Sequence, residues 1–287
     1  IRMRNQLSYL YNGRKAISVF FNDCDTIIVP RNFCPEILNE ILFNKNIIFA
    51  SIYDAFEEPD YLSAMDNVVG KKTGLLFVHQ YGIVNCSLRD KILSICLDRN
   101  ILFLDDFCLC KPTDFFSNLV DLKIKNYAAL ISFGYSKYVD LNHGCLASSH
   151  NTCFASEKQK DSNSNNPNFN LNIFIENLLS DEIKRNIHSD KLRRLYVKHF
   201  SNFSHLDSPW RFCLKLEKES SLLQFFISPF CQGLFWGFNY PPLIRIQGSK
   251  FFAATWDVED YMIVNLFHDF RFDLKMAKKL IKLSKCE

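Results

Sequence analysis

Between Thr26 and Ser149, short apolar runs alternate with segments whose apolar residues recur every three or four positions. The runs are rich in Ile, Leu, Val and Phe, which is typical of strands buried on both faces. This alternation predicts an α/β fold: a mostly parallel sheet with helices on both faces, right-handed crossovers and ligands at the carboxyl ends of the strands. We expect strands at 26–29, 47–50, 75–78, 101–104 and 129–133, and helices at 35–43, 61–69 and 87–97.

The composition changes after this region. Residues 156–170 are polar and rich in Asn and Ser, as in a loop or linker. Beyond them come a helical segment at 171–200, strand-like runs around 210–216 and a basic amphipathic segment at 274–285, which we expect to be a packed helix with a solvated lysine face. We therefore expect a large α/β domain over 1–155, a polar linker or loop over 156–170 and a small α+β domain over 171–287.

Charge and composition exclude several classes of function. The chain has 287 residues, 48% of them hydrophobic, which excludes disorder, and its net charge of +3 argues against a dedicated nucleic-acid binder. Its longest uncharged stretch, which runs from 222 up to the charge at Arg245, is broken by Gly and Pro, so no membrane span is expected. The eleven cysteines form no C-x-x-C pair, which favours reduced thiols in a cytoplasmic protein.

Common catalytic motifs are absent. The nine glycines form no G-x-G, and the chain has no P-loop, no G-x-S-x-G and no H-E-x-x-H. The seven histidines are widely spread, so no metal site is predicted. Dinucleotide-binding, hydrolase and zinc-protease functions therefore lack their main support.

Two strand ends carry the remaining chemistry. Asp105 and Asp106 close one expected strand, and because side chains alternate along a strand only one of them can face a site. The next strand leads through Ser132 to Lys137, so a carboxylate and a lysine meet at one sheet edge. Considered alone, a strand-end Asp can also be a turn former, and a loop lysine such as Lys137 can be a solvated surface charge.

Together these groups fit the chemistry of pyridoxal 5'-phosphate (PLP). In such sites a lysine forms the Schiff base, an Asp keeps the pyridinium nitrogen protonated, and helix-start N–H groups hold the phosphate. Asn12, Gly13 and Arg14 precede an apolar run and predict such a helix start. Lys137 is then the expected proton carrier.

The order of sequence blocks resembles the DegT/DnrJ/StrS family of fold-type-I, PLP-dependent sugar aminotransferases, over nearly all of the chain. The blocks are Asn12 to Ala16, Asp25 to Pro30, Val78 to Gly82, Leu104 to Asp106, Ser132 to Lys137 and Asn239 to Leu243.

The resemblance assigns roles to individual residues. It implies Lys137 as the Schiff-base lysine and Asp106 as the pyridinium partner, with Asp105 facing away. Ser132, together with Gly13 and Arg14 at the helix start, would bind the phosphate. His79, Tyr81 and Gly82 match a block near the cofactor, where a purely structural turn is the alternative. The catalytic residues expected are thus Lys137 and Asp106.

The resemblance also implies a function: a homodimeric aminotransferase that moves an amino group from glutamate or a similar donor to a nucleotide-linked keto-sugar. Leu109 stands where the family has Gln or His, and the glycine-rich run after Lys137 is reduced, so a catalytically silent homologue that binds partners remains an alternative. A dehydrating PLP enzyme is a third, against which Lys137 argues. We expect a solvated helix face, not a nucleotide site, from the basic residues Lys184, Arg185, Lys191, Arg193, Arg194 and Lys198.

Overall fold

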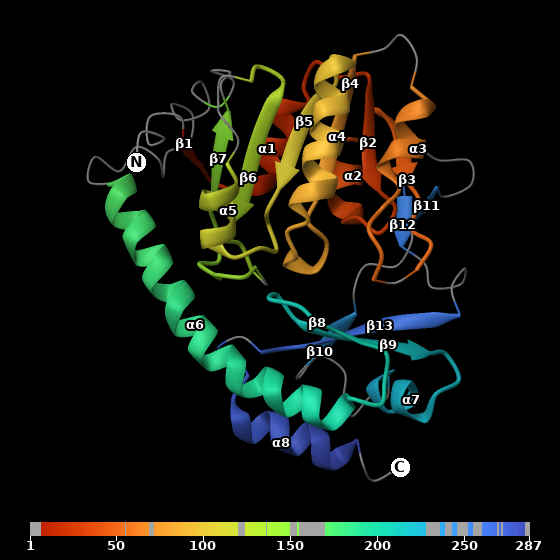
Figure 1. Ribbon diagram of the computed structural model, residues 1–287, viewed down its shortest axis with the longest axis vertical. Coiled ribbons are helices and arrows are strands. Elements are labelled where there is room, and N and C mark those ends of the chain that lie inside the picture. The colour runs from red at the N-terminus through yellow and green to blue at the C-terminus, as the bar shows by residue number, and fades with distance from the viewer. Residues whose placement is uncertain are drawn as a thin grey trace.

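The structure is a computed structural model. It describes residues 7–54, 56–68, 72–119, 124–135, 137–149, 154, 170–227, 236–238, 243–245, 252–254, 260–268, 270 and 272–284. These residues build a large sheet and a small sheet, one above the other in Figure 1, with a long helix running along both.

The large sheet contains every strand that the apolar runs predict. Its strands are β1 (Leu7–Leu10), β2 (Thr26–Pro30), β3 (Asn46–Ala50), β4 (Thr73–Val78), β5 (Leu102–Asp106), β6 (Tyr127–Ser132) and β7 (Cys145–Ser149), in the order β1-β7-β6-β5-β4-β2-β3. Strands β3, β2, β4, β5 and β6 pair in parallel, whereas β7 is antiparallel to β6 and to β1. The prediction of a mostly parallel sheet is confirmed. Strands β1 and β7 were not predicted, because these short segments lack the long aliphatic runs of the others.

Helices cover both faces of this sheet, as predicted. They are α1 (Gly13–Phe20), α2 (Pro35–Glu40), α3 (Tyr61–Asp66), α4 (Cys86–Asp98) and α5 (Pro112–Asn118). Figure 1 shows α4 and α5 in front of the sheet and α1 and α2 behind it. We call the two sides the α4 face and the α1 face. The expected helices at 35–43, 61–69 and 87–97 are confirmed with slightly different ends, and α5 was not predicted.

Alternate residues of each strand feed two separate cores, because the side-chain period of a strand is two. On β5, Phe103 packs on the α4 face and Leu104 on the α1 face. The same alternation separates Phe77 from Leu76 on β4. The face on which a strand-end side chain lies is therefore fixed by its position in this alternation.

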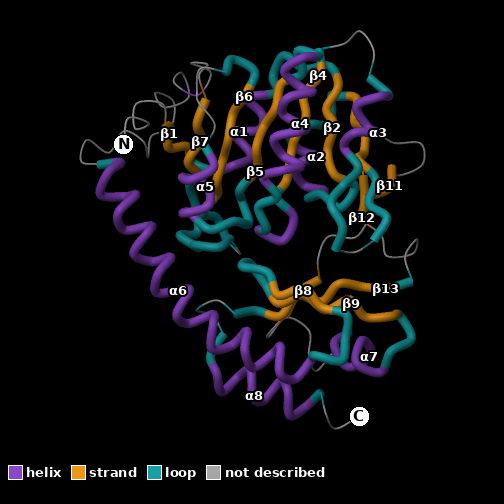
Figure 2. Tube along the Cα trace, viewed as in Figure 1, coloured by secondary structure: helices purple, strands orange, loops and turns teal. Residues whose placement is uncertain are grey.

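The small sheet follows the long helix α6 (Leu171–Phe200), which was predicted over the same residues. Its strands are β8 (His205–Asp207), β9 (Phe212–Glu217), β10 (Trp236–Phe238) and β13 (Tyr261–Leu266), in the order β10-β13-β9-β8, with α7 (Ser221–Ile227) beside β9. The pair β11 (Leu243–Arg245) and β12 (Phe252–Ala254) lies away from this sheet, where β12 contacts α2 (Figure 2). The chain after α6 thus also returns to the large sheet.

Helix α6 joins the cores of the two sheets. Leu178, in its first half, belongs to the α4-face core, whereas Leu192 and Tyr196 belong to the core of the small sheet. The expected linker at 156–170 lies outside the described residues except for Asn170, which caps α6 by accepting hydrogen bonds from the N–H groups of Asn172 and Ile173.

The terminal helix α8 (Leu274–Leu283) packs on α6 (Figure 1). Ala277 and Leu280 are buried and the lysines are exposed, so the predicted packed helix with a solvated lysine face is confirmed. Among the described helices, none combines the length and apolar character that crossing a membrane requires.

Candidate active site

The candidate site lies at the carboxyl ends of β5 and β6. The first ends at Asp106 and the second at Ser132, and because the two strands are parallel neighbours their ends meet at one edge of the large sheet. The turn after β6 carries Lys137, whose N–H donates to Gly134 O at 3.2 Å.

Asp105 points to the α4 face, away from the site, as the resemblance implies. Its Oδ1 lies 2.9 Å from His79 Nε2, and its Oδ2 accepts from Arg89 Nε at 2.9 Å and from the Tyr127 hydroxyl at 3.1 Å. The Asp105 side chain is fully buried. Three donors satisfy this carboxylate, so its role in the described structure is to tie β5 to β4, α4 and β6.

Asp106 lies on the α1 face, and only 5% of it is exposed. Its Oδ1 accepts the N–H of Cys108 at 2.8 Å, which fixes the carboxylate against the turn that follows β5. The strand alternation therefore gives the two consecutive acids different surroundings.

The start of α1 lies beside Ser132. Asn12 caps the helix by accepting the N–H of Lys15 at 2.9 Å, and Gly13 is the first helical residue. A Cβ at Gly13 would lie 3.5 Å from Ser132 Cβ and 3.7 Å from Cys108 Sγ. The missing side chain leaves a small cradle at a helix N-terminus, bounded by Ser132 Cβ and the Cys108 thiol, and helix N-termini are places of the kind that accept an anion.

The charges of Lys137 and Asp106 both affect the pKa of the Cys108 thiol. Burial raises the pKa of Cys108 well above its ordinary value; the negative charge of Asp106 raises it further, whereas the positive charge of Lys137 lowers it. Cys108 thus lies within electrostatic reach of the lysine and the carboxylate, and beside Gly13. Gly13 therefore lies beside both Ser132 and Cys108, Asp106 accepts the Cys108 N–H, and the charge of Lys137 affects the same thiol.

Two of the predicted site residues have other partners. The His79 side chain lies on the α4 face with Asp105, and its ring centroid is 4.3 Å from that of Phe107. The Arg14 guanidinium donates to Glu40 at 2.8 Å, with about half of each side chain exposed. The structure does not bring either side chain together with Lys137 and Asp106.

The turn after β4 is held in a conformation that few residues adopt. Tyr81 and Gly82 have φ values of 56° and 77°. A Cβ at Gly82 would lie 2.3 Å from Leu109 O, so this turn packs directly against the loop that follows Asp106. Tyr81 packs against Cys213 and Ile263 of the small sheet, and so joins the two sheets near the site.

Sequence reasoning missed Arg185. We expected it on a solvated helix face, but only 2% of it is exposed, and its Nη1 donates to Lys137 O at 3.1 Å. A signal was present in the helical spacing: Arg185 continues the stripe of buried positions that includes Leu178, Leu192 and Tyr196. The prediction gave more weight to the basic side chain of Arg185 than to its position in this spacing.

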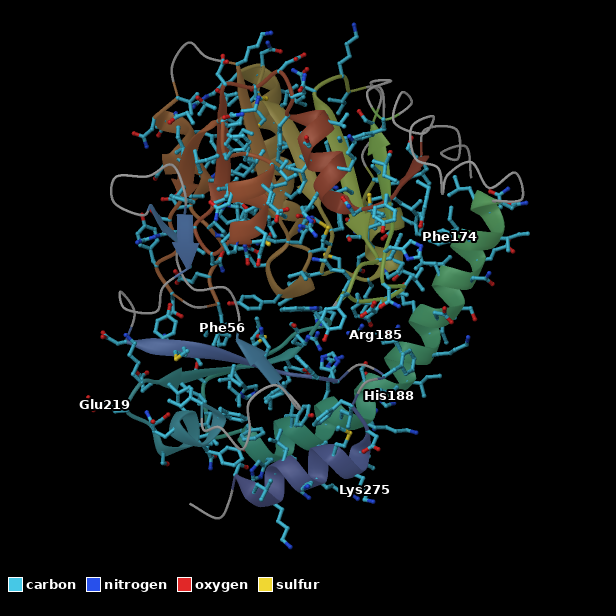
Figure 3. The ribbon with its side chains drawn as sticks, turned by 180° about the vertical axis from the view of Figure 1, so that it is seen from behind. Phe56, Phe174, Arg185, His188, Glu219 and Lys275 are labelled. Atoms are coloured by element: carbon cyan, nitrogen blue, oxygen red, sulfur yellow. The ribbon has the colours of Figure 1, made fainter. Side chains whose placement is uncertain are left out.

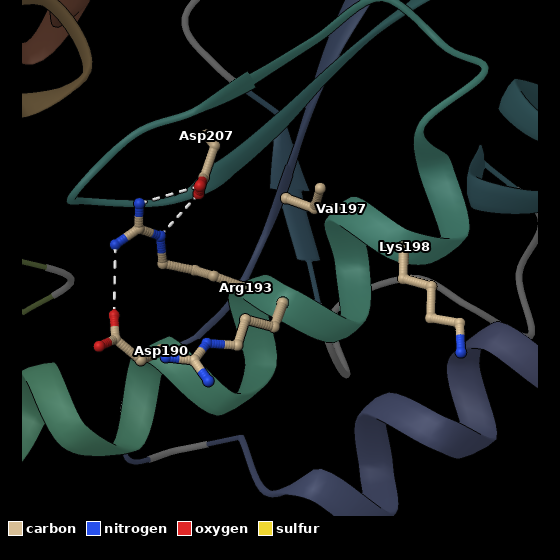
Figure 4. A pocket seen from close by; sticks show the side chains of 6 residues that line it. Asp190, Arg193, Val197, Lys198 and Asp207 are labelled. Carbon is tan, nitrogen blue, oxygen red and sulfur yellow. Dashed lines mark hydrogen bonds and ion pairs between the residues drawn. The ribbon is translucent and has the colours of Figure 1, made fainter.

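The other basic residues of α6 lie elsewhere. Arg193, Arg194 and Lys198 line a surface pocket of about 400 Å³ together with Asp190, Val197 and Asp207 (Figure 4). Arg193 donates to both carboxylate oxygens of Asp207, at 2.6 and 2.9 Å, and lies 3.5 Å from Asp190. The charge of Arg193 is therefore already compensated, and this residue is only partly exposed, whereas Arg194 and Lys198 are exposed, as expected for a solvated face.

Comparisons with known proteins place this architecture. Neither sequence families nor curated proteins gave a match. Among solved structures, a DegT DnrJ EryC1 StrS aminotransferase from Brucella abortus is 12% identical, with a TM-score of 0.66 over 98% of this chain and 85% of that chain. Helicobacter pylori PseC, an aminotransferase of pseudoaminic acid biosynthesis, is 15% identical, with a TM-score of 0.67 over 98% and 86%.

A third similar structure is the Escherichia coli GDP-4-keto-6-deoxy-D-mannose-3-dehydratase with bound hydrated PLP. It is 13% identical, with a TM-score of 0.64 over 98% of this chain and 88% of that chain. These likenesses extend over both sheets. The chain therefore has the fold of the DegT/DnrJ/StrS sugar aminotransferases and related PLP enzymes, as the order of its sequence blocks predicts.

Proposed function

We propose that this protein is a PLP-dependent aminotransferase that moves an amino group from an amino acid such as glutamate to a nucleotide-linked keto-sugar. The observation that carries the proposal is that Gly13 lies against Ser132 and Cys108 while Asp106 accepts the Cys108 N–H, although these residues come from distant parts of the sequence. The turn that follows Ser132 carries Lys137. The shared fold supports the same reaction class.

These residues fit PLP. The cradle at Gly13 lies at helix-start N–H groups, which suit the phosphate dianion, and Ser132, whose Cβ bounds the cradle, carries a hydroxyl that can also bind phosphate. Arg14 would contribute its backbone N–H, because its guanidinium is paired with Glu40. Asp106 offers a fixed carboxylate for the ring nitrogen, and Lys137 offers the amine that the aldehyde requires.

Each residue then has a separate task. When bound, PLP supplies an electron sink for the substrate α-carbon. The Asp106 carboxylate would hold a proton on the ring nitrogen, because an opposite charge favours the charged form of a base. Lys137 Nζ would hold the cofactor covalently and would take and return the proton at the substrate α-carbon.

The first experiment measures cofactor attachment. Purified protein incubated with PLP is reduced with borohydride, and the modified peptide is identified by mass spectrometry. We expect a visible absorbance band before reduction and the modification on Lys137, both absent in Lys137→Ala. Lys91→Ala, which changes an exposed lysine of α4, is the control and should behave as wild type. Absence of PLP attachment in the wild type would overturn the proposal.

The second experiment measures amino transfer. Loaded protein is mixed with a panel of amino acids and the 2-oxo acid formed is quantified, with nucleotide-linked keto-sugars as acceptors. We expect Asp106→Asn to retain bound PLP and to lose at least about a hundredfold in turnover, since the carboxylate acts on cofactor electronics. Full activity of Asp106→Asn would remove this residue from the site.

Leu109 favours one other candidate function, a catalytically silent homologue that uses the fold to bind a partner. This residue offers no polar side chain to the cofactor ring, and its carbonyl packs against Gly82. Tight PLP attachment without turnover on any donor would select this reading over the aminotransferase.

The remaining organisation is part of the proposal. We propose domains at 1–155 and 171–287 with a linker at 156–170, which is supported by the separate core of the small sheet, while the first half of α6 packs in the α4-face core of the large sheet. Limited proteolysis should cut first within 156–170. We also propose a homodimer, to be tested by light scattering, and a cytoplasmic location, which is supported by the reduced thiols of Cys24, Cys86, Cys96, Cys108, Cys110 and Cys213.

A further inference from the structure

Through Arg185, helix α6 contacts the turn that carries Lys137. Figure 3 shows Arg185 on the side of α6 that faces the space between the two sheets. Its Nη1 donates to Lys137 O at 3.1 Å, and its Nη2 donates to Trp210 O at 3.3 Å. One buried guanidinium therefore links the lysine of the large sheet to the segment that enters β9 of the small sheet.

Tyr138 and Asn186, the neighbours of Lys137 and Arg185, form further contacts between the turn and α6. The guanidinium carbon of Arg185 lies 4.1 Å from the centroid of the Tyr138 ring, a cation–π contact, and the Tyr138 hydroxyl donates to Asn186 Oδ1. Two consecutive residues of α6 thus hold two consecutive residues of the turn. Burial raises the pKa of the Tyr138 hydroxyl to about 12, so this hydroxyl remains a donor at neutral pH.

The base of the turn is closed by its own backbone. Leu141 N–H donates to Phe133 O at 2.8 Å, and Lys137 N–H donates to Gly134 O at 3.2 Å. These backbone bonds set the shape of the turn. The orientation of the turn relative to Asp106 depends on contacts that other segments make with it. Arg185 supplies two donors of one rigid fork, which a lysine side chain does not reproduce.

The part of α6 that carries Arg185 is itself fixed to the large sheet. Glu182, one turn earlier, is 3% exposed and accepts the Thr113 N–H at 2.8 Å and the Thr113 hydroxyl at 2.6 Å. Leu178 packs in the α4-face core. Arg185 is therefore held in place before it contacts the turn.

We infer that Arg185, with Asn186 beside it, is a positioning residue that holds Lys137 in the direction required for covalent attachment of PLP. The inference rests on the proposed function, because it assigns Lys137 that attachment. Through Trp210 O, the same guanidinium makes the placement of Lys137 depend on the position of the small sheet.

The test compares Arg185→Met, which keeps a long side chain but no donor, with Arg185→Lys, which restores one charged donor. Arg193→Met, on the same helix at the surface pocket, is the control. Two quantities are measured: the rate at which PLP modifies Lys137, trapped with borohydride, and the hydrogen-exchange rate of the amides of 134–141 in cofactor-free protein. The second measurement does not depend on PLP.

We expect Arg185→Met to slow Lys137 modification and to speed amide exchange in 134–141, each about tenfold, since hydrogen bonds from a charged donor are lost. Arg185→Lys should recover part of both effects, and Arg193→Met should match wild type. A side chain that only fills space would give equal results for the Met and Lys variants, which would overturn the inference, as would Arg185→Met behaving as wild type.

The two proposals fail in different ways. If wild type takes up no PLP on Lys137, the proposed function fails and amide exchange alone decides whether Arg185 holds the turn. If neither Arg185 variant folds, Asn186→Ala is measured instead, because it removes only the Tyr138 contact. Wild-type exchange in 134–141 of Asn186→Ala would then overturn the inference, and faster exchange would support it.

Discussion

Asp105 and Asp106 are consecutive residues of β5 whose carboxylates lie on opposite faces of the large sheet. Asp105 is bonded to His79, Arg89 and Tyr127, and Asp106 to the N–H of Cys108. The first carboxylate has the surroundings of a structural residue, and the second lies beside the residues of the candidate site.

Replacement of Asp105 is expected to destabilise the fold strongly. Asp105→Ala leaves Arg89 and His79 buried without this carboxylate, and the free energy of unfolding should fall by about 3–5 kcal/mol. Denaturant unfolding followed by circular dichroism measures the loss. Asp90→Ala is the matched control, since it removes a carboxylate that also contacts Arg89 but is 63% exposed, and should cost about 0–1 kcal/mol. Equal losses in both variants would contradict the assignment.

Replacement of Gly13 is expected to affect the cofactor but not the fold. An alanine Cβ would meet its neighbours at 3.5 Å or more, an ordinary contact, so Gly13→Ala should keep or raise the free energy of unfolding by up to about 1 kcal/mol. PLP affinity should fall at least about tenfold, because the methyl group fills the cradle. The PLP affinity of Gly13→Ala and of the control Arg14→Ala is measured by fluorescence titration. Arg14→Ala should bind PLP as wild type does. A large loss of affinity in Arg14→Ala would show that the Arg14 guanidinium contributes to the site.

Replacement of Gly82 is expected to disturb the turn after β4. An alanine would have to adopt φ of +77° with its Cβ 2.3 Å from Leu109 O, and we expect a loss of about 2–4 kcal/mol in unfolding free energy. Urea unfolding provides the measurement. Gly134→Ala, whose Cβ would lie 3.7 Å from Ser132 Oγ, should change the value by less than about 1 kcal/mol. A neutral Gly82→Ala would show that this turn is not held against the β5 loop.

Stability is expected to fall in mild acid because of His268. This histidine is fully buried with Nε2 3.3 Å from Ser208 O, and burial, followed by the charges of Arg185, Arg211 and Arg193, lowers its pKa to about 3. Between these two pKa values the histidine is protonated in the unfolded chain, where its pKa is near 6.5, but remains neutral in the folded chain. Between pH 6.5 and 3 this group should cost about 1.4 kcal/mol of stability per pH unit, and nothing above pH 7.

The measurement is the difference in unfolding free energy between wild type and His268→Gln as a function of pH. The acid loss should be smaller in the variant, with the two curves converging in slope above pH 7. His143→Gln, which changes an exposed histidine, should leave the slope as in wild type. Parallel curves for wild type and His268→Gln down to pH 4 would contradict the prediction.

Much of the fold follows from local patterns. Strands β2 to β6 and helix α4 were predicted because buried strands and amphipathic helices each have a period and composition that a short window contains. Strand alternation predicted that only one of Asp105 and Asp106 could face the site, and the family resemblance implied that Asp105 faces away from it. The placement of Asp106 and Ser132 at neighbouring strand ends, with Lys137 on the turn that follows, was predicted from parallel pairing, which places consecutive strand ends at one edge.

Other placements depend on contacts between distant segments. Arg14 was expected to face an anion, but Glu40, from another helix, lies close enough to pair with it. His79 was expected near the cofactor, but the acid it meets is Asp105 on the opposite face. In both cases the residue type was informative, and the partner was decided by packing.

Arg185 shows this limit most clearly. The sequence by itself determined a parallel α/β sheet, a long helix after it, and a lysine and an acid at one sheet edge, because each depends on periodicity along a single segment. Only the tertiary structure decided that a basic residue of that helix is buried between two sheets and bonded to the backbone of Lys137. The physical reason is that burial and hydrogen-bond partners are properties of surfaces brought together from distant segments, and a charged residue type carries no local mark of which surface will cover it.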